Sequence, residues 1–280
     1  LRLRARAVLD AEAQFRAAAN QLRATLSRYF PALLELCSGA DERWLWRLLT
    51  RCATPDAAAK LTTKALQTLL HACRVRRIDA AALQAVLRAP HLRASRGVER
   101  GCAEDVARLV EHLELLHSQK TRATKLRDEA VERLRDEQKT SSPTADVDLV
   151  ASMPGAGPMV VAALFGEAEA ALRDRDLGVL RAAAGVAPIT KRSGKSCVVM
   201  MRRARNLILA NALFHAARVA AMNDERFRTL LASLRARGQS YGRALRGVAD
   251  RYLDVLFAVL RSGAPYDPGR SRGSASPAAT

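Results

Sequence analysis

The segment Gly185–Asn206, GVAPITKRSGKSCVVMMRRARN, contains two hydroxyl side chains inside a cluster of cations. The hydroxyls belong to Ser193 and Ser196, and the nearest cations are Lys191, Arg192 and Lys195. Gly194-Lys195-Ser196 resembles the end of a P-loop, in which Lys and Ser bind nucleotide phosphates and Mg²⁺. A P-loop also needs a glycine where β-branched Ile189 stands, because its backbone turns tightly there. The segment is therefore not predicted to bind a nucleotide.

The alternative chemistry is the attack of a serine on a phosphodiester. Ser193 stands between Lys191-Arg192 and flexible Gly194, so we expect its hydroxyl to be exposed among positive charges. These charges would stabilise both an alkoxide-like attack and the pentacoordinate phosphorane that results from it. Ser193 is therefore the candidate nucleophile, and Ser196 is the fallback candidate.

A long acid-free stretch surrounds these serines. No Asp or Glu occurs between Asp176 and Asp224, whereas a merely solvated face would carry acids that balance like-charge repulsion. A further basic helix is expected to follow it. The residues predicted to bind DNA or RNA phosphates here are Lys191, Arg192, Gly194, Lys195, Arg202, Arg203, Arg205, Asn206, Arg237, Arg243 and Arg246. His215, on the apolar side of the intervening helix, is predicted to be a core residue.

The sequence PGAGP at 154–158 separates two apolar helical segments, which is the pattern of a helix-hairpin-helix element. Gly155 and Gly157 would let the backbone approach a phosphate, and the next helix would offer N–H donors at its N-terminus. Both glycines are therefore added to the predicted phosphate-binding set. An ordinary tight turn between helices is the alternative.

The whole chain of 280 residues has a formal net charge of +18. This excess indicates a polyanionic partner, nucleic acid before membrane, because no apolar stretch approaches the length that spans a bilayer. A basic proteome encoded by a GC-rich genome is the alternative source of the charge. The five cysteines lack the paired spacing of a zinc site, and no metal ligands are assigned to this chain.

The elements that must position these residues are expected to be mainly α-helical, because the chain is rich in Ala, Leu and Arg and poor in strand formers. Heptad-like spacing predicts two long helices, one ending before Pro31 and one over about 103–139. They would form a long coiled-coil-like helical hairpin, or pair with another subunit, although Glu12, Lys120 and Arg127 interrupt the two seams.

Shorter helices are expected between the two long ones, with breaks at Thr54-Pro55 and Ala89-Pro90. Trp44 and Trp46 are predicted to be core residues there. A polar linker with Pro143 marks a domain boundary. The predicted organisation is a helical, coiled-coil connecting and multimerisation region at 1–142, a compact helical domain with the helix-hairpin-helix element at 146–268, and a disordered basic tail at 269–280.

Several segments of the C-terminal half resemble a known family in consistent order and spacing. They are MPGAGP, AGVAPITKRSGKS, RRARN…LFHAARVA, LRARGQSYGRALRGVADR and the final Tyr266-Asp267. From about Asp148 to Pro268 the chain is similar to the C-terminal transposase domain of bacterial insertion-sequence transposases of the IS110/IS116/IS902 type. The preceding helical region, including RYFPALLEL at 28–36, is similar to the connecting region of that family.

The resemblance implies DNA transposition and recombination, with Ser193 matching the nucleophilic serine of the family's Ser-Gly turn. In the family, an N-terminal RuvC-like domain of RNase H fold holds Mg²⁺ with an acidic quartet. Nothing before Ala145 has that pattern, so we expect this chain to lack the metal-holding domain and to be inactive alone. The implied partners are DNA, a structured noncoding guide RNA and further copies of the chain, in the bacterial cytoplasm at nucleoid DNA.

Two departures from the family pattern leave the function open between two hypotheses. The usual Arg-Gly-Asn appears here as Ala204-Arg205-Asn206, and the Leu-Arg that follows appears as Leu209-Ala210. The first hypothesis is the C-terminal part of a transposase that binds nucleic acid and supplies the serine for phosphodiester cleavage and strand exchange. The second is a non-catalytic nucleic-acid-binding or multimerisation fragment derived from such a transposase.

Overall fold

The computed structural model describes residues 1–90, 94–141, 144–194, 196–200 and 202–269. The chain forms two compact units. We call Ala7–Thr124 the helical unit, and we call Leu1–Arg6 together with Lys125–Thr280 the hairpin unit, after the β-hairpin that it contains. The predicted mainly α-helical fold class is confirmed, because nearly all regular structure in the described residues is helix.

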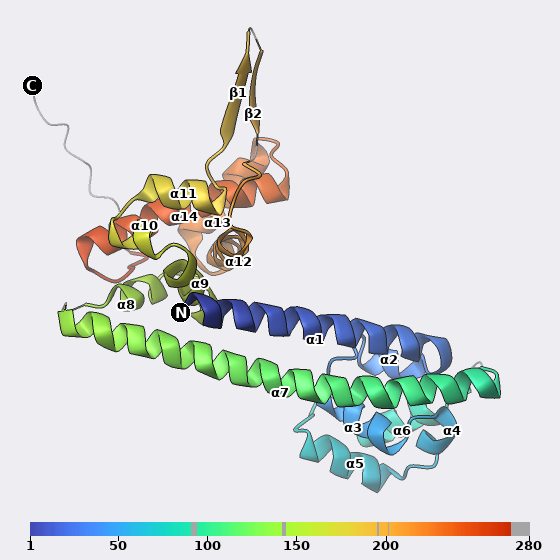
Figure 1. Ribbon diagram of the computed structural model, residues 1–280. Helices are drawn as coiled ribbons and strands as arrows, with labels where there is room; N and C mark the ends of the chain where they lie inside the picture. The colour runs from blue at the N-terminus through green and yellow to red at the C-terminus, as the bar shows by residue number, and fades with distance from the viewer. Residues whose placement is uncertain (91–93, 142–143, 195, 201, 270–280) are drawn as a thin grey trace, which may run out of the picture. The chain divides into compact units, whose positions relative to one another are not determined.

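The helical unit contains most of two long helices and a group of short helices that come between them in the chain (Figure 1). Their bounds are α1 (Arg2–Tyr29), α2 (Ala32–Leu36), α3 (Arg43–Arg51), α4 (Pro55–Ala58), α5 (Thr63–Ala72), α6 (Ala80–Arg88) and α7 (Arg96–Ser141). The expected breaks are confirmed, since Thr54 caps α4 by accepting a hydrogen bond from the Ala57 N–H and α6 ends just before Ala89-Pro90.

The core of the helical unit is built around aromatic side chains, as the sequence predicts for Trp44 and Trp46. Each tryptophan is 1% exposed, and Trp46 Nε1 donates a hydrogen bond to the Ala40 carbonyl at 3.0 Å. Phe15 and His117 pack against Trp46 with ring centroids 5.7 and 5.8 Å away. The pKa of His117 is lowered, mainly because burial disfavours the charged form of its ring.

Helices α1 and α7 contact each other within the helical unit through the residues that interrupt their apolar seams. Lys120 Nζ lies 2.9 Å from Glu12 Oε1 and 5.2 Å from the centroid of the Phe15 ring. The negative charge of Glu12 on α1 and the positive charge of Lys120 on α7 therefore form an ion pair across the two seams, and the Phe15 ring adds a cation–π contact. The predicted pairing of the two helices is present, and their assembly as a coiled coil remains a prediction.

The hairpin unit holds seven helices and one two-stranded antiparallel sheet among its described residues, besides the ends of α1 and α7. Their bounds are α8 (Asp146–Ala151), α9 (Pro158–Glu167), α10 (Glu169–Arg173), α11 (Leu177–Ala184), β1 (Ile189–Ser193), β2 (Ser196–Met200), α12 (Leu207–Asn223), α13 (Glu225–Ala236) and α14 (Tyr241–Ser262). Helix α12 packs against α9, α13 and α14, so it lies at the centre of this unit's core.

The segment after α14 is fastened to the same core. The Tyr266 N–H donates to Ser152 Oγ at 2.8 Å, and the Tyr266 hydroxyl donates to Asp224 Oδ2 at 2.7 Å. Asp224 also caps α13 by accepting from the Arg226 and Phe227 N–H groups. Tyr266, quoted above in the family resemblance, thus has a packing role that connects α8 with the junction of α12 and α13.

The boundary between the two units does not coincide with the linker expected between residues 142 and 146. It falls inside α1 and α7, so the end of α7 and the linker both belong to the hairpin unit. The division into domains at 142 and 146 remains a prediction from sequence. None of the described helices has the length and apolarity needed to cross a membrane.

Candidate nucleic-acid interface

The two candidate serines lie at the tip of the β-hairpin, which projects from the helices of its unit (Figure 1). Strand β1 pairs with β2 so that Ser193 stands opposite Ser196 at the turn, and Ile189 stands opposite Met200 at the base. Gly194 follows Ser193 with φ +56, a backbone angle that glycine adopts without steric cost and that tight hairpin turns require. The expected turn at Ser193-Gly194 is therefore present, but the strands on either side of it were not predicted.

Both serines are exposed, and neither packs against the helical core. The residue that follows the turn begins a strand, whereas the Lys-Ser of a P-loop begins a helix. The hairpin geometry therefore excludes a P-loop, in agreement with the sequence argument. What remains is a pair of hydroxyls carried away from the body of the unit, at a place that a bulky polymer can approach.

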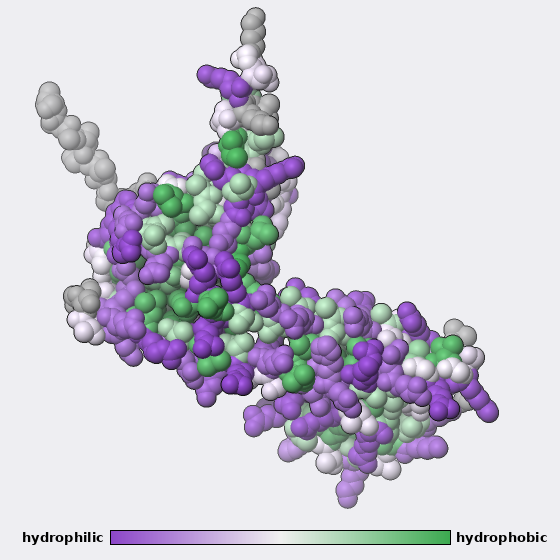
Figure 2. Space-filling view, in the orientation of Figure 1, coloured by the Kyte–Doolittle hydropathy of each residue, from purple (hydrophilic) through white to green (hydrophobic). Residues whose placement is uncertain are grey.

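Exposed cations accompany the hairpin from its tip to its base. Arg192 is exposed in β1 and Arg203 is exposed between β2 and α12. Hydrophilic side chains are visible at several places along the hairpin and around its base (Figure 2). Lys195 and the Lys191 side chain, also predicted to bind phosphate, lie outside the described residues.

The base of the hairpin holds two partly buried arginines of the predicted set. Arg205 Nη1 donates to the Arg202 carbonyl at 3.0 Å. Arg202 Nε is buried and has no hydrogen-bond partner among the residues that the structure describes. Buried donors are normally paired, but this nitrogen has almost no accessible surface, so an external phosphate oxygen does not reach it in this conformation.

Three further arginines of the predicted set come from α14 and from the end of α13. Arg237 and Arg243 are exposed, and Arg246 is partly buried. All three belong to the hairpin unit, but only Arg246 lines a cavity together with Arg205. The structure thus brings Arg205 and Arg246 together and leaves Arg237 and Arg243 on the surface.

Asn206 has a role inside the unit that differs from the predicted phosphate contact. Its Oδ1 accepts hydrogen bonds from the Ile208 and Leu209 N–H groups, so it caps α12. Its Nδ2 donates to Glu167 Oε2 at 2.8 Å. Both ends of the amide have partners within the protein, so capping accounts for Asn206, and its phosphate contact stays a prediction.

Glu167, which the sequence argument missed, fixes the start of α12 through this contact. Its side chain is 1% exposed, and Arg6 binds both carboxylate oxygens, with Nε at 2.7 Å and Nη2 at 2.9 Å. The hydrogen bonds from Arg6 are the main cause of the lowered pKa of Glu167; burial acts against them, and the Asn206 bond supports them. The partners are distant in sequence, so no local pattern marks this residue.

The two glycines of PGAGP differ in their surroundings. Gly155 has φ +81, and a Cβ there would lie 2.6 Å from the Ala216 carbonyl oxygen, so this glycine is needed for close packing on α12. Gly157 is exposed at the N-cap of α9, and no heavy atom lies within 4 Å of its would-be Cβ. The ordinary-turn alternative accounts for Gly155, and only Gly157 is open to a phosphate.

The position of His215 also differs from the prediction made from the sequence. Its side chain is exposed, not buried, and its ring lies edge-on to Phe214 with centroids 5.7 Å apart. Helices α9, α11, α13 and α14 contact α12, and His215 is not among the residues of α12 that this packing buries. The prediction of a core histidine is therefore wrong.

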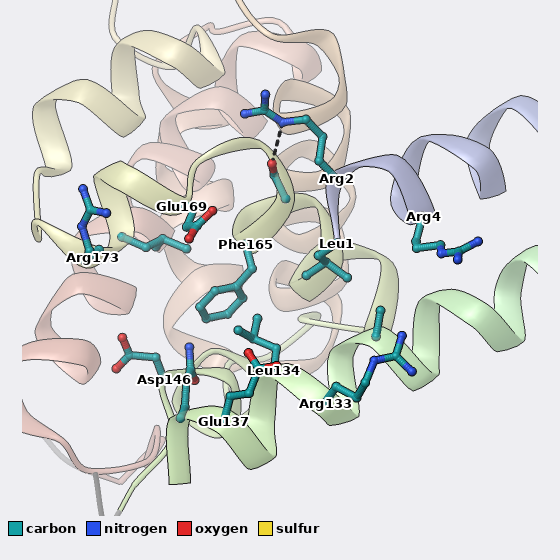
Figure 3. Close-up of a pocket in the computed structure, with 14 residues that line it drawn as sticks. Leu1, Arg2, Arg4, Arg133, Leu134, Glu137, Asp146, Phe165, Glu169 and Arg173 are labelled. Carbon is teal, nitrogen blue, oxygen red and sulfur yellow. Dashed lines mark hydrogen bonds between the residues drawn. The ribbon is translucent and has the colours of Figure 1, made fainter. Parts of the chain in front are cut away.

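A larger cavity of about 880 Å³ lies elsewhere in the hairpin unit, where the start of α1, the end of α7 and helices α9 and α10 meet. Phe165 and Leu134 line it together with charged residues of both signs, and Arg2 donates to the Gly166 carbonyl at 2.8 Å (Figure 3). Asp146 lines the cavity and is paired at 2.8 Å with Arg175, which is not a lining residue. None of the β-hairpin residues lines this cavity, so we do not place the serine chemistry there.

No group of three or more His, Cys, Asp or Glu side chains suited to a metal ion occurs among the described residues. The acids of α8 are engaged in ion pairs, since Asp148 contacts Arg135 at 2.7 Å and Lys139 at 3.3 Å. The residues present therefore do not fit a catalytic Mg²⁺ site.

The family resemblance is supported by comparison with known proteins. Residues 147–232 match a family model described as the transposase IS116/IS110/IS902 family. This range begins in α8, ends in α13 and contains the complete β-hairpin with Ser193. The similarity therefore covers the part of the chain that carries the candidate serine.

Several insertion-element proteins are similar to the chain over much of its length. A mini-circle protein of Streptomyces coelicolor, named as a transposase for IS117, is 29% identical over 95% of this chain and 64% of that protein. The 44.8 kDa protein of insertion element IS116 from Streptomyces clavuligerus is 27% identical over 89% of this chain and 60% of its own length. The 42 kDa protein of insertion element IS900 from Mycobacterium paratuberculosis is 28% identical over 81% of this chain and 55% of its own length. The chain thus spans less than two thirds of these relatives.

Proposed function

We propose that this chain is the C-terminal part of a DNA transposase, in which the hairpin unit binds DNA phosphates and Ser193 is the nucleophile. The observation that carries the proposal is the position of Ser193 at the exposed tip of a projecting, acid-free β-hairpin. The similarity of residues 147–232 to a transposase family supports the reaction class. Exposed Arg203 supports binding of phosphates near the hairpin base.

The proposed reaction is a transesterification. Ser193 Oγ forms a bond to phosphorus while one phosphorus–oxygen bond to a deoxyribose breaks, and the hydroxyl proton ends on the released deoxyribose oxygen. The resulting phosphoserine ester keeps the bond energy needed to rejoin the strand to another end. Cations of the acid-free stretch that contains the hairpin would offset the negative charge of the pentacoordinate phosphorane.

Further partners follow from the same proposal. Mg²⁺ would be held by a RuvC-like domain outside residues 1–280, so no step is assigned to it here. A structured noncoding guide RNA would pair with the DNA, and further copies of the chain would associate through the helical region. The protein would act in the bacterial cytoplasm.

The test is a covalent-trapping experiment on the chain joined to the metal-holding domain of a relative, with Mg²⁺ and a labelled DNA target. We expect a denaturant-resistant protein–DNA adduct that Ser193→Ala abolishes, while DNA affinity stays within a few-fold because one hydroxyl and no charge is removed. Ser196→Ala is the matched control and should still form the adduct. An adduct that persists in Ser193→Ala would end the proposal for Ser193 and, if Ser196→Ala abolished it, move the role to Ser196.

A second candidate function is a non-catalytic nucleic-acid-binding or multimerisation module. The two departures from the family pattern, at Ala204-Arg205-Asn206 and Leu209-Ala210, favour it. The coding DNA upstream of Leu1 separates the two candidates. A RuvC-like segment with an acidic quartet there, in frame or frameshifted, supports the transposase, and its absence from the locus supports the module.

A further inference from the structure

A small cavity of about 110 Å³ lies at the base of the β-hairpin, between the end of α11, one side of α12 and the middle of α14. Its lining combines an aromatic ring, two arginines and an amide, supplied by Phe214, Arg205, Arg246 and Asn211. The backbone of Gly185 and Val186, which leads into β1, closes another side. This mixture differs from an apolar packing defect, which would have no charged wall.

The cavity wall is built around a close contact between Gly185 and Arg205. Gly185 has φ +69, and a Cβ at this position would lie 2.3 Å from Arg205 Cδ. The glycine therefore lets the Arg205 stem pass directly over the backbone, while Arg205 Nη1 is held by the Arg202 carbonyl. The position of the Arg205 guanidinium is thus determined from two sides.

The charge of Arg246 is not neutralised within the hairpin unit. No carboxylate pairs with it in the described ranges, and Asp250, one turn later on α14, is instead 2.6 Å from Arg181 Nε. Arg181 also binds Asp254 at 3.0 Å. The two acids of α14 nearest to the cavity are therefore engaged by Arg181, and both cavity arginines remain available to an anion.

Phe214 gives the cavity a surface for a flat apolar ligand. Its side chain is 36% exposed, although it is one of the larger apolar residues of α12, and its aromatic contact with His215 is edge-on. An accessible aromatic ring beside cations is the arrangement with which proteins bind single-stranded nucleic acid, by stacking on a base and pairing with its phosphates. The Asn211 amide can both donate to and accept from a base edge.

We propose that this cavity binds one unpaired nucleobase of a nucleic-acid strand, stacked on Phe214, with Arg205 and Arg246 on the adjacent phosphates. The proposal rests on the proposed function, because it makes the cavity part of the same interface. Strand β1 runs from the cavity side to Ser193, and its five residues span four rises, about 13 Å. That length corresponds to roughly four steps of B-form DNA. The unpaired base would therefore lie a few nucleotides from the phosphate that Ser193 attacks.

The test measures the affinity of the whole chain for two labelled DNA oligonucleotides, one intact and one with an abasic central stretch but the same phosphates. Wild type should bind the intact strand about five- to 150-fold more tightly, the range that one stacked base contributes. Phe214→Leu should reduce this ratio to near one, whereas Phe214→Tyr should preserve it. Met222→Leu, at another exposed apolar position of α12, is the matched control and should leave the ratio unchanged. The same pair made in RNA shows which kind of strand the cavity prefers.

A direct readout guards against a change of affinity that arises from misfolding. Phe214→Trp places a fluorophore in the cavity, and we expect the intact strand to quench its emission and the abasic strand not to do so. Met222→Trp should respond equally to both strands. Equal affinity of wild type for both strands, with salt-dependent binding retained, would overturn the cavity proposal alone. Loss of salt-dependent binding to both strands would instead overturn the proposed nucleic-acid function.

Discussion

The helical unit and the hairpin unit differ in how their charges are compensated. In the helical unit the cation that enters the α1–α7 seam, Lys120, has its own carboxylate in Glu12. In the hairpin unit, ion pairs such as Arg181–Asp250 lie on the helices, and the stretch that contains the β-hairpin has no acid at all. Cations without any acid nearby in the sequence are therefore concentrated in residues 177–223.

This contrast suggests a division of roles between the two regions. Buried aromatic packing stabilises a fold, whereas exposed charges contribute little to stability and uncompensated cations attract a polyanion. Substitutions in the core of the helical unit should therefore change unfolding, and substitutions near the hairpin should change binding.

Trp46→Ala should have the largest effect on stability. The side chain is fully packed and its Nε1 is hydrogen-bonded to Ala40, so its removal should cost about 3–5 kcal/mol of unfolding free energy. Chemical denaturation followed by circular dichroism measures the loss, and Trp46→Phe should recover part of it. DNA affinity of the protein that remains folded should be unchanged; a parallel loss of affinity would contradict the division of roles.

Gly155→Ala should destabilise the hairpin unit more than Gly238→Ala. Both glycines have similar positive φ, +81 and +78, so the backbone strain is about the same. Only at position 155 would the new Cβ meet a backbone oxygen, that of Ala216, and this overpacking should add about 1–3 kcal/mol. Thermal unfolding of the two variants measures the difference. Equal stability combined with weaker DNA binding of Gly155→Ala would restore the phosphate role of this glycine.

Glu167→Gln should lower stability by about 2 kcal/mol at neutral pH, because the charged hydrogen bonds from Arg6 are weakened. The lowered pKa of Glu167 means that its contribution is present above the unfolded-state value of about 4.3 and is lost as the pH falls through the folded-state value. Wild type and variant should therefore converge in acid. A constant difference between neutral and acidic pH would show that the carboxylate charge is not the stabilising feature.

Arg203→Gln should leave stability within about 0.5 kcal/mol, as expected for an exposed side chain. Its effect should appear in DNA binding, where the slope of log affinity against log salt should fall in magnitude by about 0.9. Arg108→Gln is the matched control in the helical unit, where Arg108 is exposed and paired with Asp105 at 3.2 Å. An equal change of slope in the control would place the DNA contact on both units, and a wild-type affinity independent of salt would contradict nucleic-acid binding altogether.

Local sequence was sufficient for most helices of this protein. Thr54-Pro55 and Asp79 are cap signals that act over a few residues, and α4 and α6 begin where those signals stand. The cap role of Asn206 has the same local signature, a polar residue before an apolar run, and was open to prediction from it. The strands of the β-hairpin were not, because their apolar residues are few and lie among cations, and strand preference depends on pairing.

Contacts between distant residues account for the remaining differences. Glu167 acquires its role from Arg6 and Asn206, and His215 is exposed because the helices packed on α12 bury other residues of that helix. A glycine is required at position 155 because the Ala216 carbonyl oxygen, which is distant in the sequence, lies where a Cβ would stand. None of these partners stands within a helical turn, so periodicity and spacing carry no information about them.

The sequence by itself determined the helical class, the excess of cations around Ser193 and the resemblance that supports a transposase, since composition and short motifs record these properties. Only the tertiary structure decided that Ser193 stands at the tip of a β-hairpin, that Asn206 is engaged by Glu167 and that Arg205, Phe214 and Arg246 share one cavity. The physical reason is that such juxtapositions depend on packing between elements. That packing is selected by the whole core of the unit and not by any single segment.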